Sequence, residues 1–192
     1  MRPEPPGRIG QHAFHEARAA STQSPVPATV VAMAPTPRCE VRAVDVDDAD
    51  AVRLFAAYFD ELREKFGSYD PPSSGELRAD ARRGVVLIAY EGENAVGCGS
   101  LRQLDAHTAE VKRMFVLAHA RGRGHARRVL RALEDAARSL GCRCVVLDTA
   151  AVLEEAAKLY VREGYVETTR YNDNPYAARW FRKDFADSEG RA

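Results

Sequence analysis

Apolar positions divide this chain of 192 residues into a tail without periodicity and a longer segment with regular periodicity. Residues 1–38 contain several clusters of proline and few large apolar side chains, so we expect a disordered tail there. An alternative interpretation is that the native protein starts at Met33 and that residues 1–32 are an upstream extension. In either case no functional residue is expected there. The pattern over residues 39–186 predicts one folded domain, and residues 187–192 are expected to be flexible.

Three segments repeat apolar residues every three or four positions, which predicts amphipathic helices. In the first helix the apolar face begins at Val52, and Gly67 ends the helix. A short polar helix is predicted after it, opened by Ser73 or Ser74 as N-cap. The predicted helices cover residues 52–66, 74–83, 123–140 and 152–163.

Between and after the helices, alternating or continuous apolar runs predict strands. The predicted strands cover residues 40–44, 84–90, 95–103, 108–116, 143–148, 165–170 and 177–185. Most neighbours are joined by hairpin turns, whereas 108–116 and 143–148 are separated by a helix and are expected to be parallel. Gly97 and Gly99 indicate close packing against another backbone. The fold class is therefore α/β (α+β), with a mixed, mostly antiparallel central sheet of six to seven strands.

The centre of the pattern is a strand ending in Met114-Phe115-Val116, followed by the turn Arg121-Gly122-Arg123-Gly124-His125-Ala126-Arg127, at which a helix begins. The backbone N–H groups of such a turn and the helix dipole bind phosphates. Glycines allow close approach of the anion, and arginines add charge-assisted hydrogen bonds. A Walker loop would need a Gly-Lys-Ser/Thr ending, which is absent. A dinucleotide-binding fingerprint would need G-x-G-x-x-G early in a βαβ unit, whereas here the glycine pair is followed by Ala126 and lies in the second half of the chain.

Charge and composition narrow the choice of ligand. The chain has 28 Lys and Arg and 28 Asp and Glu, so its formal net charge is zero and a general nucleic-acid binder is disfavoured. Five arginines between residues 121 and 131 form a local basic patch, which fits a single polyphosphate ligand or a solvated helix start. No apolar run is long enough to span a membrane. The four cysteines lack metal-ligand spacing and indicate packed, reduced thiols in a cytoplasmic protein, with no metal site.

The pattern R-x-x-G-x-G/A, filled by Arg121, Gly124 and Ala126, resembles the coenzyme A pyrophosphate loop of the GCN5-related N-acetyltransferase (GNAT) family. Two further segments match this family in order and spacing, and the resemblance covers about residues 40–186. These segments are Glu110-Val-Lys-Arg-Met-Phe-Val and Leu159-Tyr160-Val161-Arg162-Glu163-Gly164-Tyr165.

The resemblance implies the GNAT fold, with helices on both faces of the sheet and splayed fourth and fifth strands. It implies acetyl-CoA as co-substrate, bound along Met114, Phe115 and Val116 and by the loop from Arg121 to Arg127. Where many members carry an Asn near the penultimate helix, this chain has Thr149-Ala150-Ala151-Val152, so backbone groups would have to hold the coenzyme there.

In this family the first helix–loop–helix region overlies the acceptor site. Tyr58, Phe66 and Tyr69 are candidates to line it, with ordinary packing as the favoured alternative for each. The C-terminal segment from Tyr171 to Tyr176, with Trp180, resembles a subgroup that acts on small molecules.

Transfer of an acetyl group to an amine needs three chemical roles. By the resemblance, Tyr160 is the general acid for the leaving thiolate, with ordinary core packing as the alternative. Glu110 is the candidate base, acting through water, with a solvated strand start as the alternative. A backbone N–H near Phe115 or Val116 would stabilise the charge on the thioester oxygen. His125 is expected to contribute only its backbone, and no histidine has a Ser or Cys partner that is recognisable from sequence.

The sequence thus predicts a cytoplasmic N-acetyltransferase that modifies a small primary amine. Two alternatives remain open: a catalytically silent acyl-CoA sensor, and an enzyme that acetylates protein N-termini or lysines. Nucleic acid and membrane are not expected partners. Trp180 suits either packing on the sheet or the surface of a homodimer.

Overall fold

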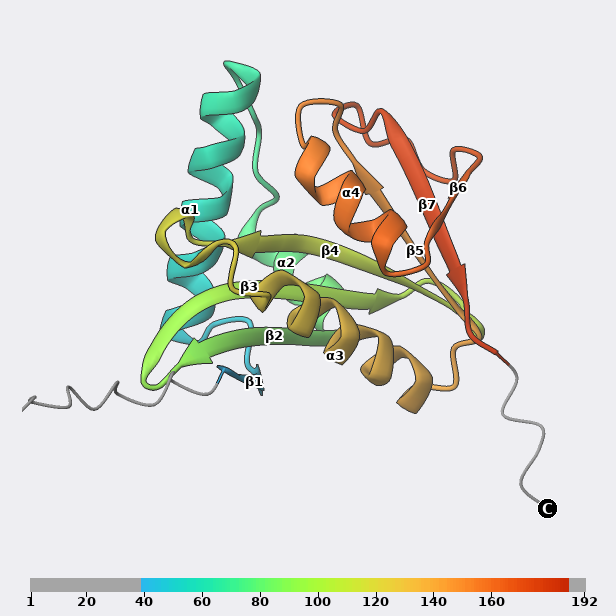
Figure 1. The fold of residues 1–192 in the computed structure, drawn as a ribbon, viewed down its shortest axis with the longest axis horizontal. Helices are drawn as coiled ribbons and strands as arrows, with labels where there is room; N and C mark the ends of the chain where they lie inside the picture. Colours follow the sequence, from blue (N-terminus) through green and yellow to red (C-terminus); the bar gives the residue numbers. More distant parts are fainter. Residues whose placement is uncertain (1–38, 187–192) are drawn as a thin grey trace, which may run out of the picture. The chain divides into compact units, whose positions relative to one another are not determined.

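The computed structural model describes residues 39–186. The predicted N-terminal tail, its alternative start at Met33 and the predicted flexible C-terminus all lie outside these residues. Seven strands form one sheet in the order β1-β2-β3-β4-β5-β7-β6, and only the β4–β5 pair is parallel (Figure 1). The strands are β1 Cys39–Val44, β2 Gly84–Glu91, β3 Asn94–Gln103, β4 Thr108–Val116, β5 Cys144–Thr149, β6 Val166–Thr168 and β7 Arg179–Asp184. The predicted mixed, mostly antiparallel sheet is confirmed.

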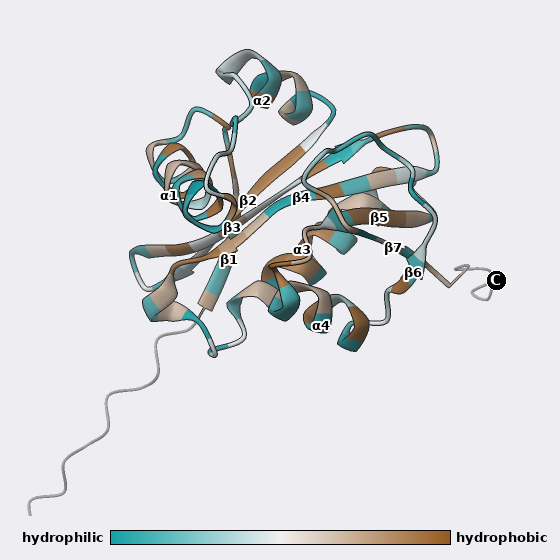
Figure 2. Cartoon of the chain, turned by 90° about the horizontal axis from the view of Figure 1, so that it is seen from above, coloured by the Kyte–Doolittle hydropathy of each residue, from teal (hydrophilic) through white to brown (hydrophobic). Residues whose placement is uncertain are grey.

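In the described part of the chain, four α-helices cover both faces of the sheet, as predicted. They are α1 Ala49–Phe66, α2 Ser74–Ala81, α3 His125–Ser139 and α4 Glu154–Arg162, and a short 3-10 helix, η1 Ala118–Ala120, precedes α3. Figure 2 shows α1 and α2 on one side of the sheet and α3 and α4 on the other. Each side has its own hydrophobic cluster, one centred on α1 with β2 and β3, the other on α3 with β3, β4 and β5.

The helix boundaries follow from capping residues. Asp48 accepts a hydrogen bond from the N–H of Asp50 at the start of α1, and Gly67 ends the helix with a left-handed φ of 75°. Ser73 and Glu76 form a capping box at the start of α2. The predicted apolar face of α1 needs one correction, because Val52 is 53% exposed and the smaller Ala51 packs in its place.

The fourth and fifth strands, β4 and β5, separate from each other, as the family resemblance implied. β4 and β5 pair only from Thr108 opposite Cys144 to Glu110 opposite Val146, although both strands continue beyond that point. On its other edge β4 carries a bulge, at which Arg113 has a φ of 56°. Bulges of this kind redirect a strand and are frequent next to active sites.

Gly97 and Gly99 of β3 both allow close packing, but only Gly97 packs against another backbone as predicted. A Cβ on Gly97 would lie 2.9 Å from the carbonyl oxygen of Phe115, which is the predicted close approach to backbone. A Cβ on Gly99 would instead meet the side chains of Met114, Val129 and Leu133 within 2.9 Å. Gly99 therefore makes room for the side chains of α3 rather than for another strand.

Candidate active site

A cavity of about 460 Å³ lies where β4 and β5 separate. Its walls include Val111–Met114 of β4, the end of β5 at Asp148 and Thr149, and Ala150 just after it. Helix α4 contributes Ala156 and Tyr160, while α1 and the loop after it contribute aromatic side chains. The cavity therefore joins the two faces of the sheet through the gap between the strands, and its size suits a small-molecule site.

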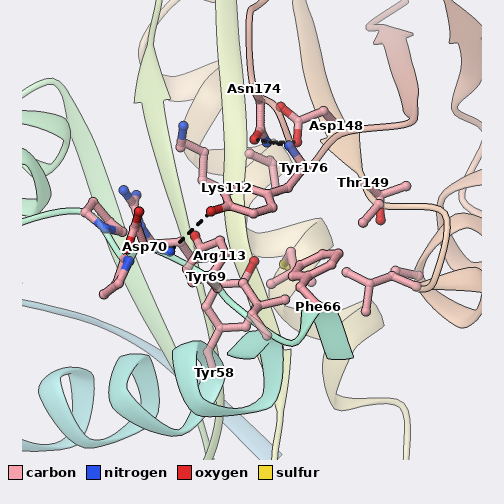
Figure 3. Close-up of a pocket in the computed structure, with 18 of the residues that line it drawn as sticks. Tyr58, Phe66, Tyr69, Asp70, Lys112, Arg113, Asp148, Thr149, Asn174 and Tyr176 are labelled. Carbon is pink, nitrogen blue, oxygen red and sulfur yellow. Dashed lines mark hydrogen bonds between the residues drawn. The ribbon is translucent and has the colours of Figure 1, made fainter. Parts of the chain in front are cut away.

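Aromatic rings form one wall of this cavity. Phe66, Tyr69 and Tyr176 contact one another, with ring centroids 4.8 to 6.2 Å apart. Tyr58 lines the cavity beside them (Figure 3). The sequence had placed Tyr58, Phe66 and Tyr69 in this region, whereas Tyr176 comes from the distant loop between β6 and β7.

Tyr160 lines the same cavity from α4. Its ring packs against Tyr165 and Phe181, with centroids 5.8 and 5.9 Å away, so the side chain is held firmly. Within residues 39–186 no group hydrogen-bonds its hydroxyl. Burial, and secondarily the charge of Asp148, raise the pKa of the phenol, which therefore stays protonated near neutral pH. The arrangement provides a proton donor with a free hydroxyl at the cavity wall.

Glu110 has a different environment. Its side chain is only 1% exposed and does not line the cavity, so the alternative of a solvated strand start is wrong. Its oxygens accept hydrogen bonds from Arg102 Nε at 2.6 Å, the Tyr171 hydroxyl at 3.1 Å and the Asn172 amide at 3.2 Å. The carboxylate is therefore paired with a guanidinium group, and both of its oxygens accept hydrogen bonds from protein groups.

The Asn172 amide connects this buried carboxylate with the cavity. Its Nδ2 group also donates to Asp148 at 2.6 Å, and its Oδ1 accepts a hydrogen bond from the Trp180 indole at 2.9 Å. Asn174 donates to the other oxygen of Asp148 at 2.8 Å. Trp180 thus has a specific polar role that neither sequence interpretation included. The sequence offers one signal for this network: Asn172 and Asn174 stand two residues apart, so their two amides can reach the same acceptor.

The predicted phosphate loop lies between η1 and α3. Gly122 and Gly124 have left-handed φ angles of 78° and 81°, which favour glycine. Within the described part of the chain, the amide groups from Gly122 to Arg127 donate to no protein acceptor. At the N-terminus of a helix of 15 residues, these free donors form a suitable cradle for an anion.

The arginines of the loop are mostly bound to acids of the protein itself. Arg121 contacts Glu61 of α1 and donates to the Val116 carbonyl at 2.9 Å. Arg123 pairs with Glu91 at 2.8 Å, and Arg127 pairs with Glu163 at the same distance. The predicted hydrogen bonds from these guanidinium groups to a phosphate would therefore compete with existing ion pairs. The backbone amides are the more available donors.

Three further predicted site residues, Met114, Phe115 and His125, differ in whether their side chains reach the cavity. Met114 lines the cavity, whereas Phe115 is buried and packs against Tyr58, with centroids 5.8 Å apart. The His125 side chain is buried, with Nε2 2.7 Å from Glu91 and Nδ1 3.1 Å from Cys39 Sγ. A cysteine partner of His125 thus exists, although the distance of 86 residues hid it from sequence inspection. These contacts attach the start of α3 to the sheet.

Other classes of site have little support among residues 39–186. No group of three or more His, Cys, Asp or Glu side chains there is arranged to hold a metal ion. In the same part of the chain, no helix combines the length and the apolar character needed to cross a bilayer. All four cysteines are free thiols.

Comparison with known proteins agrees with this geometry. Residues 51–165 match the acetyltransferase (GNAT) family. An "IAA acetyltransferase" of Azospirillum brasilense is 32% identical over 116 residues, which cover 56% of this chain and 74% of that protein. The uncharacterized N-acetyltransferase YhfO of Bacillus subtilis is 29% identical over 138 residues, covering 68% of this chain and 92% of that protein.

Solved structures show the same fold. A putative acyl-CoA N-acyltransferase from Klebsiella pneumoniae has a TM-score of 0.62 at 26% identity, covering 76% of this chain and 97% of that one. A GNAT family acetyltransferase from Elizabethkingia anophelis with acetyl-CoA bound has a TM-score of 0.58 at 14% identity, covering 77% and 98%. The chain belongs to the acetyltransferase (GNAT) family.

Proposed function

We propose that this member of the GNAT family transfers the acetyl group of acetyl-CoA to the primary amine of a small molecule. The observation that carries the proposal is the free hydroxyl of Tyr160 at the wall of the cavity between β4 and β5. A catalytically silent protein would need neither this hydroxyl nor an acceptor cavity beside it. The four free thiols suit a cytoplasmic location, which is part of the proposal.

Acetyl-CoA would supply an activated acetyl thioester, and the residues present suit its binding. The free amides from Gly122 to Arg127 would hold the pyrophosphate, with His125 and Ala126 contributing backbone only. The edge of β4 left unpaired by β5, from Met114 through Phe115 to Val116, would hold the pantetheine chain with backbone groups. A backbone N–H near Phe115 or Val116 would stabilise charge on the thioester oxygen.

Two carboxylates are candidates for taking the proton of the acceptor ammonium. Glu110 was expected from the resemblance, yet it is buried and bonded to Arg102, Tyr171 and Asn172. Asp148 lines the cavity and therefore suits proton acceptance better, directly or through a water molecule. We assign Glu110 the role of a positioning residue that acts through Asn172. Tyr160 would give its proton to the leaving thiolate, which yields coenzyme A and an N-acetylated amine.

The proposal is tested by following thiol release from acetyl-CoA with a panel of amines, amino acids, polyamines and aminoglycosides. Coenzyme-induced thermal stabilisation is measured on the same samples. Turnover with a small amine supports the proposal. Stabilisation without turnover on the whole panel would favour the silent sensor or a protein acceptor, and absence of both would contradict coenzyme binding.

A further inference from the structure

The parallel register brings a cation and a carboxylate to matching positions on the two separating strands. The β4–β5 pairing ends with Glu110 opposite Val146, and the next residues on the same face are Lys112 and Asp148. Both line the cavity (Figure 3). They lie too far apart to form an ion pair with each other, so each is available to a molecule bound between them.

Asp148 is fixed by neutral donors. Its two oxygens accept hydrogen bonds from the amides of Asn172 and Asn174, at 2.6 and 2.8 Å. These amides orient the carboxylate but carry no charge, and no Lys or Arg among residues 39–186 forms an ion pair with it. A partly buried, oriented carboxylate without a counter-ion is a good binding site for an ammonium group.

Lys112 keeps hydrogen-bonding capacity for an anion. Its ammonium lies 3.5 Å from Glu110, beyond a good hydrogen bond, and Arg102 already binds the same oxygen at 2.6 Å. The lysine side chain is 28% exposed and has three donors. Arg113, the other cation of the cavity, is committed to Asp80 and Ser100. Lys112 is therefore the available partner for a substrate carboxylate.

The third contact surface is the wall formed by Phe66, Tyr69 and Tyr176. The backbone N–H of Asp70 donates to the Tyr176 hydroxyl at 3.2 Å, which attaches the loop before β7 to the loop after α1. Three adjoining rings beside an ammonium site favour an aromatic or long apolar group. A polyamine or aminoglycoside would instead bring a second ammonium towards Lys112.

We infer that the acceptor is a free α-amino acid with an aromatic or long apolar side chain. Its ammonium binds Asp148, its carboxylate binds Lys112, and its side chain lies against the aromatic wall. The inference rests on the proposed function and specifies the substrate class of the same site. The product would be the corresponding N-acetylated amino acid.

The test compares two acceptors that differ only in the carboxylate, L-phenylalanine and phenethylamine, with thiol release as the readout. We expect kcat/KM to be about 10–100-fold higher for phenylalanine, the range for one hydrogen-bonded charge pair. Lys112→Met should lower kcat/KM for phenylalanine by a similar factor and leave phenethylamine unchanged. Lys158→Met is the matched control, because Lys158 is exposed on α4 and bound to Glu155.

Equal turnover of the two acceptors by the unaltered protein would overturn the inference, and this comparison needs no folded variant. Equal losses on both acceptors in Lys112→Met would overturn it as well. Turnover of other amines without any amino acid would have the same meaning, while leaving the proposed acetyl transfer intact. The proposed function itself fails if no acceptor releases thiol, and the inference then fails with it.

Discussion

The proposed phosphate loop and the proposed acceptor side of the cavity are built in different ways. The loop depends on backbone, because two left-handed glycines and the start of α3 leave a row of amides free. The acceptor side depends on side chains from distant segments, such as Asn172, Asp148 and Lys112. Under the proposed function, the co-substrate would be bound by local backbone geometry, whereas selectivity for the acceptor would arise from tertiary contacts.

The largest expected effect is on the backbone side. Gly124→Asp places a side chain with negative charge in the cradle at a φ of 81°, so KM for acetyl-CoA should rise by more than about 100-fold. Gly141→Asp is the control, because Gly141 has the same φ of 81° and follows the other end of α3. Gly141→Asp should leave KM for acetyl-CoA unchanged in steady-state kinetics. If Gly124→Asp leaves it unchanged as well, the loop is not the phosphate site.

Tyr160 should affect the chemical step, acetyl transfer, rather than the binding of acetyl-CoA. Tyr160→Phe removes the hydroxyl and keeps the ring contacts with Tyr165 and Phe181, so kcat should fall by about 10–100-fold without loss of stability. KM for acetyl-CoA should change little. Tyr165→Phe is a useful control from the same cluster, since its ring does not line the cavity. An unchanged kcat in a folded Tyr160→Phe variant would remove Tyr160 as the acid.

Asn172 should affect the acceptor side alone. Asn172→Ala removes the donor shared by Asp148 and Glu110, so kcat/KM for the acceptor should fall by about tenfold. Acetyl-CoA binding, measured by calorimetry, should stay normal because the loop is separate from this network. Equal losses for both substrates would mean that Asn172 supports the whole fold rather than the acceptor site.

The smallest expected effect is on stability. Burial would raise the pKa of Asp80, yet Arg113 and Arg102 prevail and hold it below its usual range. A depressed pKa adds stability above the unfolded-state value of about 4, and that stability is lost as pH falls through the folded value. Asp80→Asn should therefore cost about 2 kcal/mol at pH 7 and much less near pH 3, in urea unfolding.

Asp135→Asn provides the control, since Asp135 is 77% exposed and, among residues 39–186, pairs only with Arg138. A loss of stability in Asp80→Asn that is independent of pH would contradict the assignment to ion pairs.

Much of the fold could be predicted from local signals. The capping residues Asp48 and Ser73, the glycine ending α1 and the turn before α3 are all visible within a few residues of sequence. In the aromatic wall of Tyr58, Phe66, Tyr69 and Tyr176, the first three could also be proposed, because the family resemblance places the first helices there.

The acceptor network could not be predicted in this way. Glu110 meets Tyr171 and Asn172 across 61 and 62 residues, and only the strand pairing brings them together. His125 at the start of α3 likewise contacts Cys39 of β1, which lies 86 residues earlier in the chain. Burial and charge balance of such residues depend on tertiary structure, so sequence patterns could not predict which groups they contact.

The most direct test is mass spectrometry of an acceptor incubated with acetyl-CoA and the purified protein, with thiol release measured in parallel. We predict one acetyl group on the amine, in equal amount to the released thiol, and strong reduction of both in Tyr160→Phe. Thiol release without an acetylated amine, or no reaction although acetyl-CoA binds, would contradict acetyl transfer in the cavity between β4 and β5.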